Sequence, residues 1–202
     1  MRNAAAALVA IVCWAGLLIQ FWTIYGNEHH LLASLWVLAR FFTILTNLIV
    51  AVVMTLAATG RRPSAELLGG VTLSTILVGL VYLWLLPGLH HRTGPAHIAD
   101  ILLHKVSPLL MSIWWLLFAP RARLKWSAPA KWLIYPLVYL AYVLARAQFD
   151  GRYPYPFLDV GRIGWLQAGL NAGGIAFAFI LAGMALVWFD AWRPLGSTRA
   201  NG

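Results

Sequence analysis

Six long stretches of the chain are nearly free of charged residues, and short polar connectors separate them. A transmembrane helix needs roughly 20 consecutive apolar residues, and all six stretches reach or approach this length. Backbone groups in lipid must be satisfied within the span, which favours helices. We therefore predict an all-α, polytopic membrane protein, a single domain over residues 1–202 with six transmembrane helices in one bundle. The predicted spans are residues 4–25, 36–59, 66–88, 98–118, 131–147 and 165–189.

The composition agrees with this pattern, since 61% of the residues are hydrophobic and only 10% are charged, whereas soluble domains carry about 25% charge. The net charge of +9 would suggest nucleic acid in a soluble protein. Here the basic residues lie mainly between apolar stretches, which indicates anionic lipid headgroups and no nucleic-acid partner. The single cysteine, Cys13, allows no internal disulfide, and no Cys/His spacing indicates a metal site. We expect neither a metal nor a cofactor.

The basic residues also predict the orientation of the bundle. If both termini are cytoplasmic, nine lysines and arginines lie on the inner side and four lie in the outer loops. The inner set is Arg2, Arg61, Arg62, Arg121, Arg123, Lys125, Lys131, Arg193 and Arg199, and the outer set is Arg92, Arg146, Arg152 and Arg162. Because cytoplasmic loops carry the excess of basic residues, we predict cytoplasmic termini, with membrane lipids as partners. The overall basic charge suggests a bacterial inner (plasma) membrane or another anionic bilayer.

Two groups of polar side chains interrupt the second and fourth predicted spans. Arg40, Thr43 and Asn47 share one face of the second helix, and Asp100 and His104 share one face of the fourth. Ionisable side chains inside a span are costly and indicate functional sites. At a rise of about 1.5 Å per residue, Thr43 and His104 both lie roughly 10 Å below the outer surface. We expect them to meet if the two helices are neighbours.

A threonine beside a histidine predicts nucleophilic catalysis, because a hydroxyl becomes reactive when a base takes its proton. Thr43 is then the nucleophile and His104 the base. Asp100, one turn earlier, is placed to orient the imidazole. Arg40 or Asn47 is placed to stabilise a developing oxyanion.

Each of these residues also has a purely structural interpretation. A threonine in a membrane helix commonly donates to its own i−4 carbonyl, and Thr43 can do the same. Arg40 can pair with Asp100 or Asp159, or extend toward the headgroups. Pro108 lacks an N–H, so we expect a kink that opens a polar gap beside the histidine.

Two further features predict local structure. Tyr153-Pro154-Tyr155-Pro156 cannot continue a regular helix and predicts a structured loop or re-entrant segment. Gly169 and Gly173 form a GxxxG pattern in the last span. Such a pattern favours close helix packing, which we expect inside the bundle, although it also suits a homo-oligomer.

Three segments together resemble the androgen-induced protein family, which includes the androgen-dependent TFPI-regulating proteins and bacterial six-span relatives. The first is Arg40-Phe41-Phe42-Thr43-Ile44-Leu45-Thr46-Asn47. The second is His104-Lys105-Val106-Ser107-Pro108, which precedes an apolar and aromatic stretch ending in Phe118-Ala119-Pro120. The third is Tyr153-Pro154-Tyr155-Pro156-Phe157-Leu158-Asp159.

The resemblance implies a membrane-embedded threonine hydrolase. Animal members cleave fatty acid esters of hydroxy fatty acids with one threonine and one histidine, and these roles would fall on Thr43 and His104. Thr46 is a second hydroxyl in the same block, and the spacing from histidine to proline is shorter than in animal members.

Two other functions remain open from the sequence. The charged residues inside the spans could line the path of a small transporter, although the inner halves of the spans are almost purely apolar. The polar cluster in the outer half of the bilayer could also serve a non-catalytic membrane protein as a lock between helices.

Overall fold

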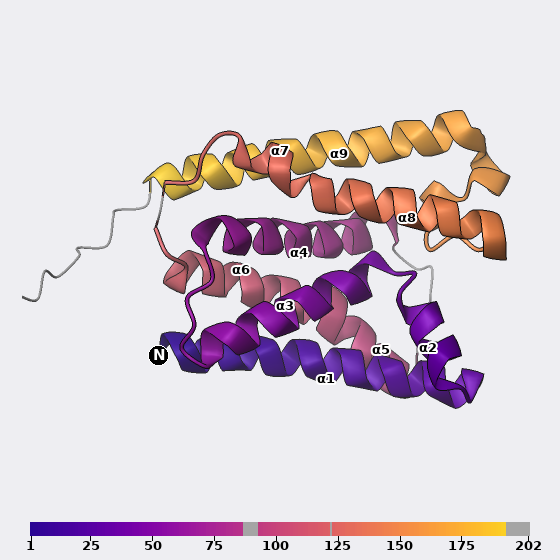
Figure 1. Ribbon diagram of the computed structural model, residues 1–202, viewed down its shortest axis with the longest axis horizontal. Coiled ribbons are helices and arrows are strands. Elements are labelled where there is room, and N and C mark those ends of the chain that lie inside the picture. Colours follow the sequence, from indigo (N-terminus) through magenta and orange to yellow (C-terminus); the bar gives the residue numbers. More distant parts are fainter. Residues whose placement is uncertain (87–92, 122, 193–202) are drawn as a thin grey trace, which may run out of the picture.

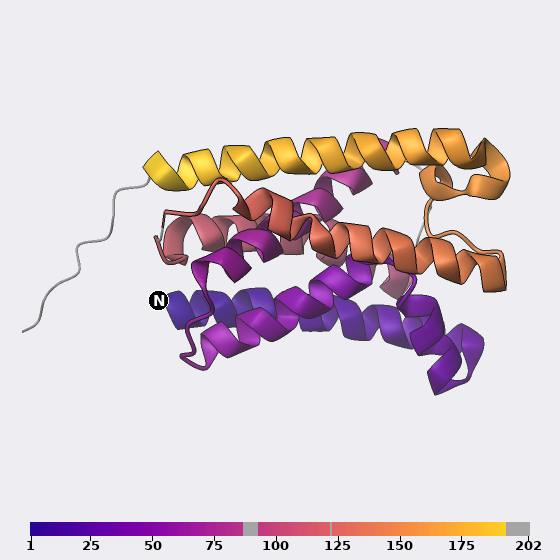
Figure 2. The same cartoon turned by 45° about the horizontal axis from the view of Figure 1, so that its top comes forward.

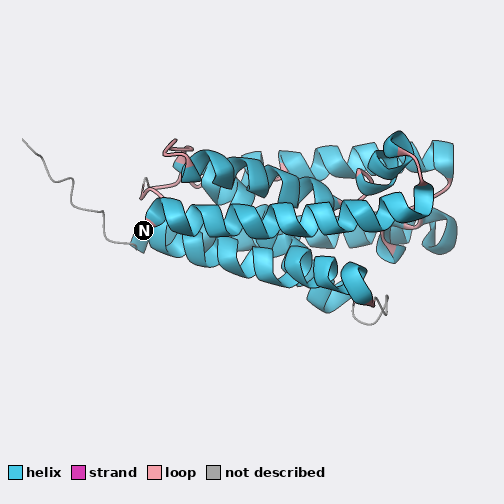
Figure 3. Cartoon of the chain, turned by 90° about the horizontal axis from the view of Figure 1, so that it is seen from below, coloured by secondary structure: helices cyan, strands magenta, loops and turns pink. Residues whose placement is uncertain are grey.

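The computed structural model describes residues 1–86, 93–121 and 123–192. Its elements are α1 (Arg2–Glu28), α2 (Leu31–Leu38), α3 (Phe42–Ala58), α4 (Ala65–Leu85), α5 (Gly94–Ile101), the π-helical turn η1 (Leu102–Val106), α6 (Ser107–Phe118), α7 (Ala128–Trp132), α8 (Ile134–Asp150), the 3-10 turn η2 (Pro156–Leu158) and α9 (Val160–Trp192). All the regular structure in these ranges is helical (Figure 3). The prediction of an all-α fold is therefore confirmed.

Five helical segments are long and apolar enough to cross a membrane: α1, α4, the continuous α5–α6 segment, α7 with α8, and α9. The bent pair α2–α3 is a sixth if it is counted as one span. Each predicted span corresponds to one of these segments, although the end of the third, residues 87–88, lies outside the described residues.

The second predicted span is not one continuous helix, which corrects the sequence prediction. α2 and α3 meet at an angle of 98°, and Phe41 before α3 has an extended backbone. Arg40 lies in this elbow, so it does not share a helix face with Thr43 and Asn47 as expected. A helix that is distant in sequence stabilises the bend: the Tyr139 hydroxyl of α8 donates to the Arg40 carbonyl over 2.8 Å. Such tertiary contacts override the helical pattern of the sequence.

The helices form a lengthwise bundle in which α1 and α3 lie on one side and α8 and α9 on the other, with α4 and α6 between them (Figure 1). The start of α1 and the end of α9 lie at the same end of the bundle (Figures 1 and 2). The α2–α3 elbow and the α8–α9 connection lie at the opposite end. We call this opposite end the elbow end.

Two apolar clusters fill the interior. The larger joins α1, α3, α4, α6 and α9, and Val50, Met54 and Met111 are fully buried in it. The smaller lies nearer the elbow end and is rich in aromatic side chains; it comprises Phe42, Val78, Tyr139, Val143, Tyr155 and Leu158.

The GxxxG pattern does not pack inside the bundle, contrary to expectation. A methyl group added at Gly169 or Gly173 would meet no other atom within 4 Å. Close helix packing instead uses glycines of α4. A Cβ at Gly70 would lie 2.6 Å from the Trp132 ring, so the absence of a side chain lets that indole lie against the helix.

Candidate active site

Thr43 and His104 meet at the elbow end, as the sequence predicted. The Thr43 hydroxyl lies 3.1 Å from His104 Nε2, within hydrogen-bonding distance. Thr43 is in the first turn of α3, directly after the elbow, and His104 is in the π-helical turn. Thr43 is 6% exposed and the His104 side chain 12% exposed. The pair is therefore largely shielded from the surroundings of the bundle.

Asp100 fixes the orientation of the imidazole. His104 Nδ1 lies 3.3 Å from Asp100 Oδ1 and 3.1 Å from the Asp100 carbonyl oxygen. Both oxygens are acceptors when the carboxylate is ionised, so the network assigns the Nδ1 proton of a neutral imidazole. Nε2 then carries the lone pair and accepts from the Thr43 hydroxyl. A base held in this tautomer is the arrangement that activates a hydroxyl nucleophile.

Tyr82 of α4 holds both the imidazole and the carboxylate, a role that sequence reasoning missed. Its hydroxyl donates to Asp100 Oδ2 over 2.5 Å. Its ring stacks on His104 with centroids 4.4 Å apart. A single tyrosine in an apolar stretch carries no distinguishing pattern, so only the packing of α4 against this segment reveals it.

The expected kink at Pro108 is instead a π-helical turn. The Ser107 N–H donates to the Leu102 carbonyl, five residues earlier, so one residue is accommodated in a wider turn around His104. Single π-turns inside α-helices occur frequently at functional sites. Gly79 of α4 faces this turn, where an added Cβ would lie 3.5 Å from the His104 carbonyl oxygen.

Asn47 connects the two halves of the site and orients Thr43. Its Nδ2 donates to the Thr43 carbonyl over 2.9 Å and to the Leu103 carbonyl over 3.1 Å. Its Oδ1 accepts from the Ser107 hydroxyl. Both amide protons are thus used within the protein, which favours the orienting role of Asn47 over the oxyanion-stabilising one.

Arg40 pairs with Asp150, not with Asp100 or Asp159 as expected. Arg40 Nη2 lies 2.6 Å from Asp150 Oδ2, and the same oxygen accepts from Arg146 Nε over 3.2 Å. Arg146 was assigned to an outer loop from the sequence, but it lies inside α8. This ion pair connects the elbow to α8. Arg40 therefore helps to position α3, although its ion pair involves neither Thr43 nor His104.

Asp159 is also separate from the cluster. One of its carboxylate oxygens accepts from the Arg162 N–H over 3.2 Å, which caps the start of α9. Thr46, the second hydroxyl of the Arg40–Asn47 segment, pairs with the Tyr135 hydroxyl over 3.0 Å instead. Neither residue lines a cavity that reaches Thr43.

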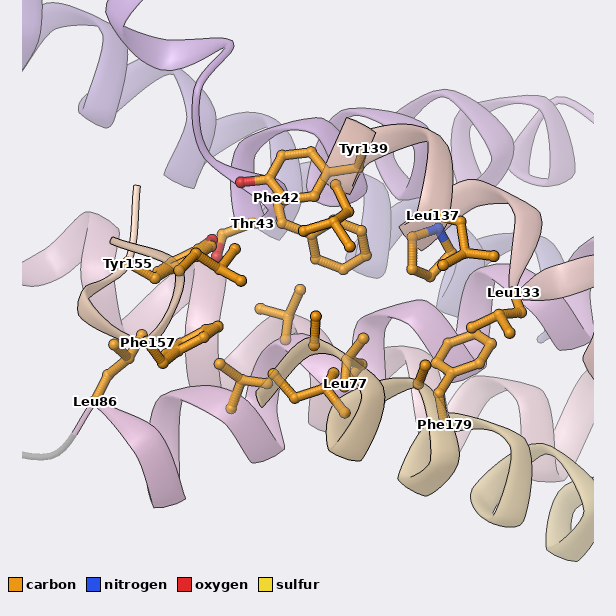
Figure 4. Close-up of a pocket in the computed structure, with 18 of the residues that line it drawn as sticks. Phe42, Thr43, Leu77, Leu86, Leu133, Leu137, Tyr139, Tyr155, Phe157 and Phe179 are labelled. Carbon is orange, nitrogen blue, oxygen red and sulfur yellow. The ribbon is translucent and has the colours of Figure 1, made fainter. Parts of the chain in front are cut away.

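The loop Tyr153-Pro154-Tyr155-Pro156 supplies a further residue, to which no role was assigned from the sequence. Tyr155 is 9% exposed and its side chain is directed toward Thr43 (Figure 4). Its hydroxyl lies beside Thr43 at the start of α3 (Figure 4). A phenol and helix N-terminal amides are donors of the kind that stabilise an oxyanion. The expected structured loop thus contributes directly to the site.

Two cavities reach the Thr43–His104 pair. One has a volume of about 90 Å³ and extends from Thr43 between α4, α8 and α9 to Leu133 and Phe179 (Figure 4). Apart from the groups around Thr43, its lining is apolar. The other has a volume of about 310 Å³ and includes Asp100 and Lys105 in its lining. Both are lined by Thr43, His104, Tyr155 and Leu86, so they adjoin at the Thr43–His104 pair.

The cluster places a hydroxyl, an imidazole and a carboxylate in hydrogen-bonded series beside cavities of different polarity. Nucleophile, base and orienting group in this geometry are the parts required for acyl transfer. This geometry carries the functional argument, since comparisons of the chain with protein-family models, curated proteins and solved structures find no match.

Proposed function

We propose that the protein is an intramembrane hydrolase of lipid esters, in which Thr43 is the nucleophile, His104 the general base and Asp100 the orienting group. The observation that carries this proposal is the 3.1 Å contact between the Thr43 hydroxyl and His104 Nε2. The imidazole is held on its other side by Asp100. The resemblance to the androgen-induced family implies the same reaction.

In the first step the Thr43 oxygen attacks the ester carbonyl carbon while His104 Nε2 takes the hydroxyl proton. The carbonyl oxygen becomes an oxyanion, for which the Tyr155 hydroxyl and the first amides of α3 are the proposed donors. The carbon–oxygen bond to the alcohol then breaks, and His104 returns the proton to the departing alkoxide. Water, deprotonated by the same imidazole, hydrolyses the acyl-threonine and restores the free hydroxyl.

The substrate we propose is an ester of the type formed between a fatty acid and a hydroxy fatty acid. The apolar cavity beside Thr43 suits an acyl chain. The cavity, with a volume of about 90 Å³, has room for a stretch of acyl chain. That stretch would be buried with its carbonyl at Thr43, and any longer tail would extend toward lipid.

We further propose that α2–α3 forms one bent span, which gives six spans with both termini in the cytoplasm of a bacterial inner (plasma) membrane. The start of α1 and the end of α9 share one end of the bundle (Figure 1). The predicted excess of inner lysines and arginines assigns that end to the cytoplasm. The site then lies in the outer half of the bilayer, where membrane lipids supply the ester.

Labelling with a fluorophosphonate tests the proposal, because this probe reacts covalently with activated hydroxyl nucleophiles. We expect the purified protein to label, and Thr43→Ala and His104→Ala to lower the labelling rate at least about a thousandfold. Thr46→Ala is the matched control, since Thr46 is a buried threonine of the same helix that pairs with Tyr135 instead. It should keep the label.

Thermal denaturation of each variant in detergent separates lost chemistry from lost folding. Failure of the native protein to label, with its fold intact, would contradict the catalytic proposal. The polar cluster would then be a lock between helices or part of a transport path. Proteoliposome flux that is abolished by His104→Ala would identify the transport path.

A further inference from the structure

Lys105 occupies an unusual place for a charged residue. It follows His104 directly in the chain and lies near the middle of the helical segment Gly94–Phe118, which is apolar enough to cross a membrane. A lysine this far inside a span is costly and marks a functional position by default. Its side chain is exposed at the surface of the protein, where it lines the larger cavity. The free energy of placing the charge there therefore requires an explanation.

The described residues do not neutralise this charge. The Lys105 ammonium lies 5.7 Å above the ring centroid of Tyr82, a weak cation–π contact. No ion pair joins it to an acidic group within the described part of the chain. Asp100 lines the same cavity, but its two carboxylate oxygens are engaged by His104 and Tyr82. Among the described residues, the Lys105 ammonium thus has no carboxylate partner of its own.

The position of the cavity indicates which part of the substrate would approach Lys105. The apolar cavity, which shares lining residues around Thr43 with the larger cavity, suits the acyl chain. With the ester carbonyl at Thr43, the alcohol part must leave by a different route. The larger cavity adjoins Thr43 and His104 and also has Gln20 and Lys105 in its lining. The alcohol part of the ester would therefore be the part that reaches the ammonium group.

We infer that Lys105 is the anion-binding residue of a subsite for the alcohol part of the substrate, so that the preferred esters carry a carboxylate or phosphate there. This inference rests on the proposed hydrolase function and names the residue that would bind the anionic group of the alcohol part. An ammonium group within a membrane-spanning segment lies in a medium of lower dielectric constant than water, so it binds an anion more strongly than a solvated surface lysine does. The same residue discriminates against neutral esters, whose approach would leave the charge unpaired.

Protection from fluorophosphonate labelling measures this subsite independently of turnover. The probe pair is a long-chain hydroxy fatty acid and its methyl ester, which differ in the negative charge and by one methyl group. We expect the free acid to protect the native protein at a lower concentration than the methyl ester. Lys105→Met should reduce this preference by roughly tenfold or more, the effect of losing a hydrogen bond to a charged group. Lys105→Arg should retain most of it.

A second pair, lysophosphatidic acid and monoacylglycerol, distinguishes phosphate from carboxylate. A lysine-dependent preference in either pair supports the subsite and identifies its anion. Lys131→Met is the control for a general loss of positive charge, because Lys131 lies on the protein surface in an ion pair with Glu66; it should leave both preferences unchanged.

The outcomes separate the two proposals. If Thr43 labels in Lys105→Met but neither preference changes, the anion subsite is wrong and the hydrolase function stands. If the native protein fails to label at all, the hydrolase function fails, and the subsite that depends on it fails as well.

Discussion

Buried hydroxyl groups occur in two neighbouring helices of this bundle, and they behave differently in the two. On α4, the hydroxyls of Thr72, Ser74 and Thr75 each donate to the carbonyl four residues earlier in the same helix. On α3, those of Thr43 and Thr46 bond side chains of other segments. All five residues are buried, so burial does not explain the difference.

The elbow explains the difference for Thr43. A threonine satisfied by its own i−4 carbonyl has no free role, but residue i−4 of Thr43 is Ala39, which lies in the break between α2 and α3. That carbonyl is not part of the α3 helix, so the hydroxyl is available to the imidazole. The bend that departs from the predicted continuous span is thus the feature that lets the Thr43 hydroxyl pair with the imidazole.

Among the variants that test this comparison, Asp100→Asn is expected to have the largest effect on the rate of labelling at Thr43. The amide lacks the charge that stabilises an imidazolium, and its NH₂ group can turn toward Nδ1 and favour the wrong tautomer. We expect the rate of fluorophosphonate labelling and of ester hydrolysis to fall at least about a hundredfold. A time course of fluorophosphonate labelling of the folded variant measures the effect.

Asp159→Asn is the matched control for the same chemical change. Asp159 caps α9 and lies outside both cavities, so labelling should continue at nearly the native rate. Equal losses in the two variants would show that the carboxylates act through stability, and the orienting role of Asp100 would be wrong.

An intermediate effect is expected from filling the apolar cavity with Ala176→Phe. Ala176 lines the apolar cavity one helical turn beyond Ala172. Phe179, three residues further along α9, lies at the far end of the cavity from Thr43 (Figure 4). The larger ring should block acyl chains that extend past this point. We expect kcat/KM for long-chain esters to fall about tenfold or more, while short-chain esters are retained, because pocket contacts of this size discriminate by that amount.

Ala191→Phe adds the same bulk to an exposed position of α9, and it should not change the chain-length preference. A uniform loss over all chain lengths in Ala176→Phe would indicate a general distortion of the helix packing. The apolar cavity would then not be the acyl site.

Much of the fold was predictable, because the physics of lipid imposes it on the sequence. Apolar stretches of about 20 residues must become helices in a bilayer. The pairing of Thr43 with His104 was predictable for a related reason. Polar residues inside an apolar bundle are stabilised by pairing with other polar residues at a similar depth. Their positions along the helices therefore limit the choice of partner.

The supporting residues were not predictable, because they depend on which helices are neighbours. Tyr82 stacks on His104 only because α4 packs against the π-helical turn. Arg40 had two acidic partners in the sequence prediction, yet it pairs with Asp150 because α8 lies beside the elbow. The π-helical turn adds one residue to a segment whose sequence predicts a regular α-helix. No periodicity of the sequence indicates this extra residue.

The smallest effect is expected from Thr75→Val on α4. Thr75 is fully buried, and its hydroxyl donates only to the Val71 carbonyl. Valine keeps the shape, and the helix keeps its backbone bonds, so thermal denaturation in detergent should show a stability change below about 1 kcal/mol. Fluorophosphonate labelling should stay at the native rate. The same substitution at Thr43 should also leave stability nearly unchanged but remove labelling, because only that hydroxyl faces an imidazole. If Thr75→Val instead abolished labelling, the hydroxyls of α4 would take part in the chemistry, and the distinction between helix-bonded and imidazole-bonded hydroxyls would fail.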